Sequence, residues 1–488
     1  MSDVEKRDYS DDGANNNRDT VADAVVEPPR GRFMRFYYQP ITQVVMLGFV
    51  CFMGPGLFNT VNGLGGGGQV DPTTGANANS ALYSFFAVMA FFAGSVNNKL
   101  GAKRTLQLGT IGYSLYIGSF LALNIHPHAG AFVVVAGGFL GICAGLLWTA
   151  QGSLMLAYPV ESQKGMFIGI FWGIFNLGGV VGASVSLGQN FHSTADAGKK
   201  SFGNGTYIGF LVLTGIGILI PLIMAEPSKM VRSDGTKVTA PRHPSWKTEF
   251  IGLYIALRDD PLIILLFPMF LASNWFYTWQ FNDFNGAIFN IRGRSLNNLV
   301  YWTSQIFGSI LIGLLLDSSR LTRRARAFVG WAVLFGMVFV VHIWGFFYQK
   351  DYTRASLKQT PLIDIDDKAY VPRIWFYIFC GLLDAMWQTT AYWMMGAMSN
   401  DPAKLAHLTG FYKSLQSAGA AGIWRADAVG IPYMNMFLST WCLLVAGLLC
   451  ALPMLYLRVK NHTDLEDETL ARMDDDGHVM PVEKVIGK

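Results

Sequence analysis

Charged residues are scarce in this chain of 488 residues: Asp, Glu, Lys and Arg together make up 14%, against the roughly 25% of an average globular domain. So few charges cannot cover the surface of soluble domains, which are therefore excluded. The net charge is only +4, and this weak excess argues against a nucleic-acid partner. Only five cysteines occur, all within apolar stretches, where cysteine packs as a small hydrophobic residue. No disulfide is expected.

Signatures of catalysis and of cofactor binding are also missing. The glycines Gly65–Gly68 are not followed by the Gly-Lys-Ser/Thr of a phosphate-binding loop, and neither a His-Glu-x-x-His motif nor a nucleophile elbow is found. No spacing of metal ligands is visible either. The sequence therefore predicts a protein that is not an enzyme and that uses no metal, cofactor or ATP.

Apolar sequence, in contrast, is abundant. Hydrophobic residues make up 51% of the chain, and they fall into runs of about 20 residues, the length that crosses a bilayer. We therefore expect an all-α membrane protein with twelve transmembrane helices. The predicted spans are Ile41–Val61, Ala78–Val96, Leu106–Asn124, Ala131–Ala157, Gly165–Leu187, Thr206–Met224, Leu262–Phe281, Asn298–Leu316, Ala327–Tyr348, Ile374–Ala397, Gly410–Ile431 and Met434–Leu457.

Polar segments divide the chain into five parts. These are a disordered N-terminal tail (1–35), a six-helix bundle (36–225), a central loop (226–261), a second six-helix bundle (262–457) and an acidic C-terminal tail (458–488). With the termini inside, 26 Lys and Arg residues fall on the inner side, 9 on the outer side and 2 within spans. The positive-inside rule therefore places both termini and the central loop in the cytoplasm. The sequon at Asn204 would then lie outside, either as a glycosylation site or as an unmodified loop residue.

The two predicted bundles resemble each other in sequence. Residues 58–63 read Phe-Asn-Thr-Val-Asn-Gly at the end of the first span, and residues 281–286 read Phe-Asn-Asp-Phe-Asn-Gly at the end of the seventh. Leu147–Thr149 in the fourth span and Met386–Gln388 in the tenth form a looser match. Parallel six-helix repeats are typical of a large class of secondary transporters.

Another repeated pattern lies in the loops after the second and eighth spans. It consists of Gly94, Asn98, Lys99 and Arg104 in the first half and of Gly313, Asp317 and Arg323 in the second. The pattern resembles the loop signature of the major facilitator superfamily, which in that family governs conformational switching. The resemblance implies that the two glycines allow close helix contact. Because Asn98 replaces the usual acid, an ion-paired latch should be weaker in the first half.

Three further segments give a more specific resemblance. They are Pro55–Asn59 with Asn62–Gly68, Ala272–Thr278 running to Phe281 and Asn282, and Phe411–Lys413 with Gln416–Gly419 and Trp424–Asp427. Together they look like the uncoordinated-93-like branch of the major facilitator superfamily in its fungal form, over residues 35–459. The resemblance implies two six-helix halves. It leaves the activity open, because some members of the branch act as regulatory subunits or trafficking partners of potassium channels.

Charged side chains within the predicted spans need a partner or a function, since a charge at the bilayer centre costs at least ~2.5–3.5 kcal/mol. Counted from the predicted cytoplasmic ends, Asp384 and Arg425 lie within roughly 5 Å of each other in depth. We expect them to pair or to share a polar cavity, either as a fixed salt bridge or as part of a gate or proton-linked site. Asp427 should find water at the outer mouth or another helix. Lys413, one turn inside its span, should extend to the interface.

The first and fourth helices of each half line the solute path in the fold that the resemblance implies. With Asp384 and Arg425, the candidate path residues are Asn59, Trp148, Gln151, Asn274, Trp275, Tyr277, Gln280, Trp387 and Gln388. Amides and aromatic rings suit a neutral or cationic organic solute, whereas plain packing of the tryptophans is the alternative.

Two functions follow from these observations. The first is gradient-driven transport of a small organic solute by alternating access, with or without a coupling ion. The alternative is a non-transporting regulatory or trafficking subunit of a channel or another membrane protein. In either case the chain is expected in the lipid bilayer of the plasma membrane, the vacuole or another endomembrane.

Overall fold

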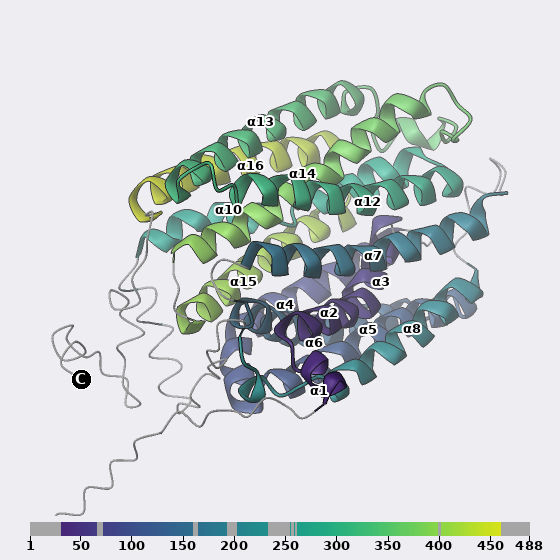
Figure 1. The fold of residues 1–488 in the computed structure, drawn as a ribbon. Helices are drawn as coiled ribbons and strands as arrows, with labels where there is room; N and C mark the ends of the chain where they lie inside the picture. The colour runs from purple at the N-terminus through teal and green to yellow at the C-terminus, as the bar shows by residue number, and fades with distance from the viewer. Residues whose placement is uncertain are drawn as a thin grey trace, which may run out of the picture.

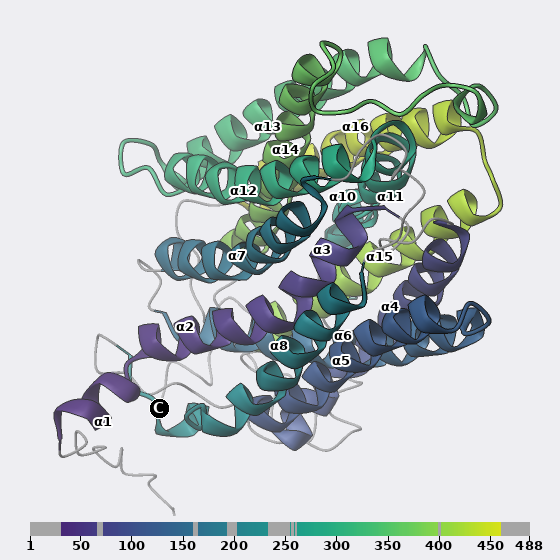
Figure 2. The ribbon, with the colours of Figure 1, turned by 90° about the vertical axis from the view of Figure 1, so that its right-hand side faces the viewer.

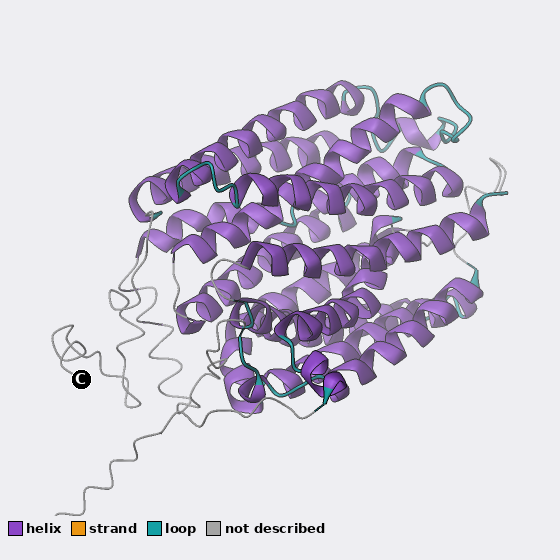
Figure 3. Ribbon diagram, viewed as in Figure 1, coloured by secondary structure: helices purple, strands orange, loops and turns teal. Residues whose placement is uncertain are grey.

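Helices make up nearly all of the described part of this computed structural model (Figure 3). The structure describes residues 31–65, 72–159, 164–192, 203–232, 254, 258, 261–398 and 402–459. The predicted tails up to residue 30 and from residue 460, and most of the predicted central loop, lie outside these ranges. A six-residue helix, α1 (Arg32–Tyr37), occupies the end of the segment predicted to be a disordered tail.

The first half contains six crossings. The first crossing is built from three consecutive pieces, α2 (Pro40–Cys51), the π-helix η1 (Phe52–Gly56) and α3 (Leu57–Gly63). The other five are α4 (Pro72–Leu100), α5 (Ala102–Ile125), α6 (Gly130–Ala157), α7 (Lys164–Asn190) and α8 (Asn204–Ile223), followed by the 3-10 turn η5 (Pro227–Lys229). Gly101 separates α4 from α5 at φ 81°, a left-handed conformation that glycine adopts without strain.

The second half repeats this plan. Its first crossing is again interrupted, running through η6 (Pro261–Leu266), α10 (Phe267–Ala272), α11 (Phe276–Thr278) and the π-helix η7 (Trp279–Gly286). The others are α12 (Ile291–Leu316), α13 (Arg323–Gln349), α14 (Tyr370–Met398), α15 (Pro402–Ala428) and α16 (Tyr433–Arg458). Side-chain caps at Asn290 and Thr322 fix the starts of α12 and α13, since each accepts a hydrogen bond from the first turn.

The twelve predicted spans correspond to these twelve crossings, and the all-α fold is confirmed. Ten of the described crossings are long and apolar enough to cross a membrane. The other two, α14 and α15, have 29 and 27 residues and are long enough, but they carry more polar side chains. Large apolar residues such as Val88, Val212 and Leu314 are 57–69% exposed on the helix surfaces, as expected of residues that face lipid.

The two halves lie side by side, the first coloured from purple to teal and the second from teal through green to yellow (Figure 1). They contact each other mainly through two helix pairs, α4 with α15 and α7 with α12 (Figure 2). Because the number of crossings is even, the start of the first crossing and the end of the last lie at the same end of the bundle. We call the opposite end, where the loops after α3, η7 and α13 lie, the predicted outer end, following the orientation predicted from the charges.

The first crossing of each half contains a π-helix, but at a different place: η1 ends just before the motif of residues 58–63, whereas η7 contains the motif of residues 281–286. Pro55 lies inside η1, and because proline has no backbone N–H, it cannot continue a regular α-helical ladder. Such π-helical turns often mark functional sites. The repeated Phe-Asn-x-x-Asn-Gly motifs, residues 58–63 and 281–286, lie opposite each other at the predicted outer end.

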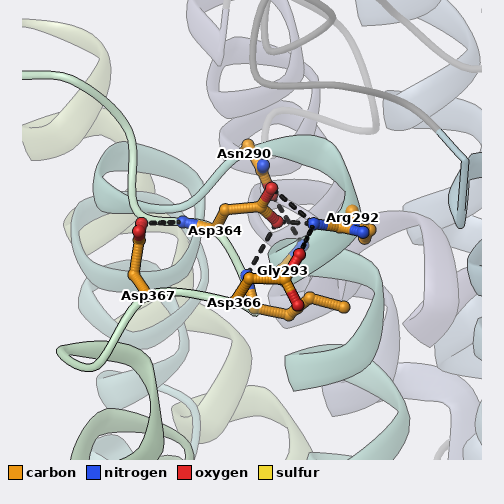
Figure 4. Close-up of polar contacts among 7 residues, drawn as sticks. Asn290, Arg292, Gly293, Asp364, Asp366 and Asp367 are labelled. Atoms are coloured by element: carbon orange, nitrogen blue, oxygen red, sulfur yellow. Dashed lines mark hydrogen bonds and ion pairs between the residues drawn. The ribbon is translucent and has the colours of Figure 1, made fainter.

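A loop between α13 and α14, here called the strap (residues 350–369), is tied to the start of α12 (Figure 4). It includes the short turn η8 (Ser356–Lys358). Arg292 donates hydrogen bonds to both carboxylate oxygens of Asp364, at 2.9 and 2.5 Å, and to Asp366 at 2.6 Å. The Arg292 guanidinium holds the pKa of Asp364 below its ordinary value. Because α12 and the strap both belong to the second half, this clamp does not join the halves.

Candidate functional site

A cavity of about 70 Å³ lies between the two halves, which is room for a few water molecules. Side chains of both halves form its wall. Most are aromatic or aliphatic, and its amides and cation are Asn59, Asn274, Gln305, Gln388, Lys413 and Gln416. The wall combines an apolar surface with a few convergent polar groups, which is the usual character of a small-molecule site.

Lys413 is the charged residue in this wall. Its side chain is 5% exposed, and its Nζ donates a hydrogen bond to Gln416 Oε1 at 2.9 Å. The ammonium also lies 4.7, 5.3 and 5.0 Å from the ring centres of Trp148, Tyr392 and Tyr412. Aromatic faces attract a cation, so these rings stabilise the charge within the bundle.

An amide network continues from Lys413 into the second half. Gln416 Nε2 donates to Asn274 Oδ1 at 2.9 Å and to Gln388 Oε1 at 3.1 Å. Gln388 also accepts a hydrogen bond from the Tyr412 hydroxyl at 2.5 Å and donates to the backbone carbonyl of Ser273 at 2.7 Å. The network therefore links α14 and α15 to the break between α10 and α11.

Asp384 lies behind the cavity wall and is 1% exposed. Its carboxylate accepts hydrogen bonds from the Tyr277 hydroxyl at 3.2 Å, from the Tyr301 hydroxyl at 3.0 Å and from Gln305 Nε2. Tyr277 and Gln305 line the cavity, so the carboxylate is one side chain away from it. Three donors satisfy a buried carboxylate without an ion pair.

Of the predicted path residues, the structure places five in the cavity wall: Asn59, Trp148, Asn274, Tyr277 and Gln388. The others are elsewhere and make local contacts. Gln151 bonds to Met155, Trp275 to Ser439, Gln280 to Tyr301 and Trp387 to Ser273. A role of any of these residues in a solute path stays a prediction.

The expected pairing of Asp384 with Arg425 is wrong. Arg425 is exposed near the end of α15 and donates to Asn77 Oδ1 of α4 at 2.8 Å. The predicted span began at Gly410, but α15 begins at Pro402. With a rise of about 1.5 Å per residue, Arg425 and Asp384 then differ in depth by roughly 15 Å.

The misplaced start of α15 also affected the prediction for Lys413, which was expected to extend to the cytoplasmic interface. It lies eleven residues after the first residue of α15, or about 16 Å into the helix. At that depth the side chain does not reach the helix end, and it is buried in the central cavity instead.

A second group of contacts, here called the outer seal, joins the two halves at the predicted outer end. Arg294 of α12 is 8% exposed and donates to the backbone carbonyls of Leu64 and Gly65 at 2.7 and 2.8 Å. Asn285 and Asn298 donate to the carbonyls of Gly63 and Thr60 at 2.9 and 3.0 Å. These carbonyls belong to the last turn of α3 and the two residues that follow it, a helix end whose carbonyls lack helical partners and favour a cation.

Asp427 forms an ion pair with a residue in another part of the same half. Its Oδ1 lies 2.5 Å from Nη2 of Arg354 in the strap, and its Oδ2 accepts from Asn282 at 2.6 Å. The same Arg354 nitrogen lies 3.5 Å from Oδ1 of Asp283, which is fully buried. Although partial burial opposes it, the charges of the two carboxylates hold the pKa of Arg354 above its ordinary value. One guanidinium therefore serves two carboxylates.

The expectation that Gly94 and Gly313 allow close helix contact is wrong for this structure. Among the described residues, a methyl group at either position would meet no atom of another helix within 4 Å. Lys99, Arg104 and Asp317 are exposed. The remaining members of the loop pattern are Asn98, whose side chain is outside the described part, and Arg323, which donates to the carbonyl of Gly396 at 3.1 Å. A switching role for this loop stays a prediction.

Asn204, the candidate glycosylation site, is the first residue of α8 and is exposed. Its Oδ1 accepts a hydrogen bond from Asn124 at 2.6 Å. The sequon therefore lies at a helix end rather than within a crossing.

Comparison with known proteins assigns the chain to a family. Residues 66–452 match the family model described as ion channel regulatory protein UNC-93. The chain belongs to the UNC-93 family. UNC93-like protein C922.05c of Schizosaccharomyces pombe is 46% identical over 94% of this chain and 91% of its own length. UNC93-like protein 1 of Arabidopsis thaliana is 39% identical over 88% of this chain and 92% of its own length. The resemblance inferred from the sequence motifs is confirmed.

Solved structures support the fold of this UNC-93 family member. The xylose transporter XylE from E. coli has a TM-score of 0.58 at 14% identity and covers 86% of this chain and 98% of its own. The E. coli fucose:proton symporter FucP has a TM-score of 0.53 at 12% identity, over 84% and 97%. At such low identity these likenesses show the major facilitator fold alone.

Several residues of this site were missed by the sequence reasoning. Gln305 and Tyr301 lie within a predicted span and look like ordinary polar residues there, so only the geometry joins them to Asp384. Arg294 was assigned to an outer loop because the eighth span was predicted to begin at Asn298. A signal was available, since the Arg-Gly-Arg at residues 292–294 follows the repeated motif of residues 281–286 after five residues.

Proposed function

We propose that this UNC-93 family member is a membrane transporter of the major facilitator type, which moves a small solute by gradient-driven alternating access. The observation that carries the proposal is the cavity between the halves, with buried Lys413 and its amide network in the wall. An ionisable group buried at this depth is costly unless it has a function. A purely structural interface would be filled by apolar packing at lower cost.

The outer seal supports the same proposal. It consists of side chains of the second half that bind backbone carbonyls of the first at the predicted outer end. Hydrogen bonds of this kind can be exchanged for water when the halves separate, whereas a continuous apolar core cannot. We therefore assign the structure to a state that is closed at the predicted outer end.

A reversible disulfide across the seal tests alternating access. Ser186 of α7 and Ser295 of α12 lie in different halves, and their hydroxyl oxygens are 2.9 Å apart. Cysteines at both positions should reach disulfide geometry with little movement. In a deletion strain screened for changes in solute uptake and resistance, the double variant should restore the phenotype only under reducing conditions. Each single cysteine variant is the control and should restore it under both conditions.

The regulatory alternative has one observation in its favour, the description of the family model as an ion channel regulatory protein. A subunit that only binds or escorts a partner does not need its halves to separate. The oxidised double variant would then restore the phenotype as well as the reduced one, and this result would refute the transporter proposal.

We further propose that both termini are cytoplasmic and that the chain resides in the plasma membrane or in a vacuolar or other endomembrane. The positive-inside rule supports this orientation. Tags at the two ends should then be protected together in sealed vesicles; protection of one tag and digestion of the other would contradict it.

A further inference from the structure

We propose that the central cavity binds a small organic anion and that the ammonium of Lys413 holds its negative group. This inference rests on the transport function proposed above and names its substrate class. It differs from the neutral or cationic solute that the amides and aromatic residues alone suggest, because the sequence reasoning put Lys413 at the membrane interface.

The hydrogen-bonding capacity of Lys413 is only partly used. An ammonium group has three N–H donors, and Nζ donates to Gln416 Oε1. The neighbouring rings of Trp148, Tyr392 and Tyr412 attract the charge through their faces, but they provide no oxygen acceptor there. As far as the described residues go, Nζ therefore has donors left for the oxygen atoms of a carboxylate or a similar anion.

The surrounding charges favour an anion as well. Among the described residues that line the cavity there is no Asp or Glu. The carboxylate that acts on Lys413 through space is Asp384, but its oxygens accept hydrogen bonds from Tyr277, Tyr301 and Gln305. A cationic solute would meet the charge of Lys413 and no acid in the wall. An anion would form an ion pair with a largely buried ammonium, where such pairing is strong when the geometry is good.

The other side chains of the cavity wall indicate what the uncharged part of the ligand should be. Rings of Phe58, Phe86, Trp148 and Phe175 face the cavity, so an apolar and preferably flat body would bury well beside the charged group. The volume of about 70 Å³ limits the closed state to small contents, and a larger solute requires the halves to separate further. A small monocarboxylate fits this description.

Two series of ligands that share an apolar body and differ in the charge of the polar group test the inference. Thermal unfolding of the purified full-length protein in an uncharged detergent is measured with benzoate, benzamide and benzylammonium, and with acetate, acetamide and methylammonium. We expect at least one carboxylate to stabilise the protein at a tenfold lower concentration than its amide or ammonium analogue. Lys413→Gln should lose this preference, and Lys413→Arg should keep it.

The inference is overturned if the amide or the ammonium ion binds as well as the carboxylate, if Lys413→Gln keeps the preference, or if no member of either series stabilises the wild-type protein. The wild-type comparison alone decides the matter if Lys413→Gln does not fold. Binding is measured without transport, so the two proposals can fail separately. Anion binding by a protein that passes the disulfide test as a non-transporter would refute the transport proposal and leave this one standing.

Discussion

Replacement of Arg294 by alanine should open the predicted outer end. Arg294 contributes two hydrogen bonds, of 2.7 and 2.8 Å, from a buried guanidinium to carbonyls of the other half. Hydrogen bonds to charged groups contribute about 1.5–3 kcal/mol each. Water replaces part of this in the open state, so we take the lower limit, about 3 kcal/mol for the pair. Since 1.4 kcal/mol corresponds to a factor of ten, the ratio of closed to open molecules should fall by about 100-fold.

Distances between spin labels at the predicted outer end measure this shift. Labels at His128→Cys in the first half and Lys350→Cys in the second report the separation of the halves, because both positions are exposed. Cys442 and Cys450, the two native cysteines that are not buried, are replaced by serine. The wild-type protein should give one short distance, and Arg294→Ala should add or favour a longer one.

Arg292→Ala is the matched control. Arg292 lies two residues before Arg294 on the same helix, but its hydrogen bonds go to Asp364 and Asp366 in the strap of its own half. Its loss should leave the distance between the halves unchanged. The reasoning is refuted if Arg294→Ala gives the wild-type distances, or if both variants lengthen them equally.

Three further predictions concern the acidic groups and the sequon. Asp283→Asn should leave the melting temperature unchanged or raise it, because it removes one of two carboxylates that share a guanidinium. Asp427→Asn should instead destabilise by about 1–3 kcal/mol, less than for a fully buried ion pair; the reverse order of melting temperatures would contradict this account. The lowered pKa of Asp364 means that its contribution is present above its ordinary value and lost as the pH falls below about 4. A spin label at Thr360 should therefore be less mobile at pH 7 than the same label in Asp364→Asn, and it should gain mobility only when the pH falls below the range in which an aspartate ordinarily titrates. If Asn204 is glycosylated, Asn204→Gln should migrate faster on a denaturing gel, and glycosidase treatment should abolish the difference; equal migration without treatment would refute modification.

The apolar runs and the repeated motifs were sufficient to predict the fold. Runs of about 20 apolar residues are expected to cross the bilayer as helices, because in lipid the backbone N–H and C=O groups can pair only with each other. The motif at residues 58–63 and its copy at 281–286 predicted two related halves, and the structure brings the two motifs into contact through Asn285 and the carbonyl of Gly63.

The candidate site was predicted only in part, because helix ends are not encoded in hydropathy. The first residues of α15, from Pro402 onward, are polar enough to resemble a loop, and the shift of eight residues moved Lys413 from the interface to the centre. It also separated Arg425 from Asp384. Pairing between helices depends on rotation and depth together, and neither can be read from a single sequence to within one turn.

The buried charged side chains are distributed unevenly between the two halves. Among the described residues, the buried charged side chains are Asp283, Arg294, Asp384, Lys413 and Asp427, and all five belong to the second half. Where the second copy of the repeated motif has Asp283, the first has Thr60, whose hydroxyl bonds to a carbonyl of its own half at 3.1 Å. The first half thus offers backbone carbonyls and aromatic rings, and the second half brings the charges to them. Solute recognition and the opening of the seal would then both depend on charges of the second half, and substitutions there should alter both more strongly than equivalent changes in the first.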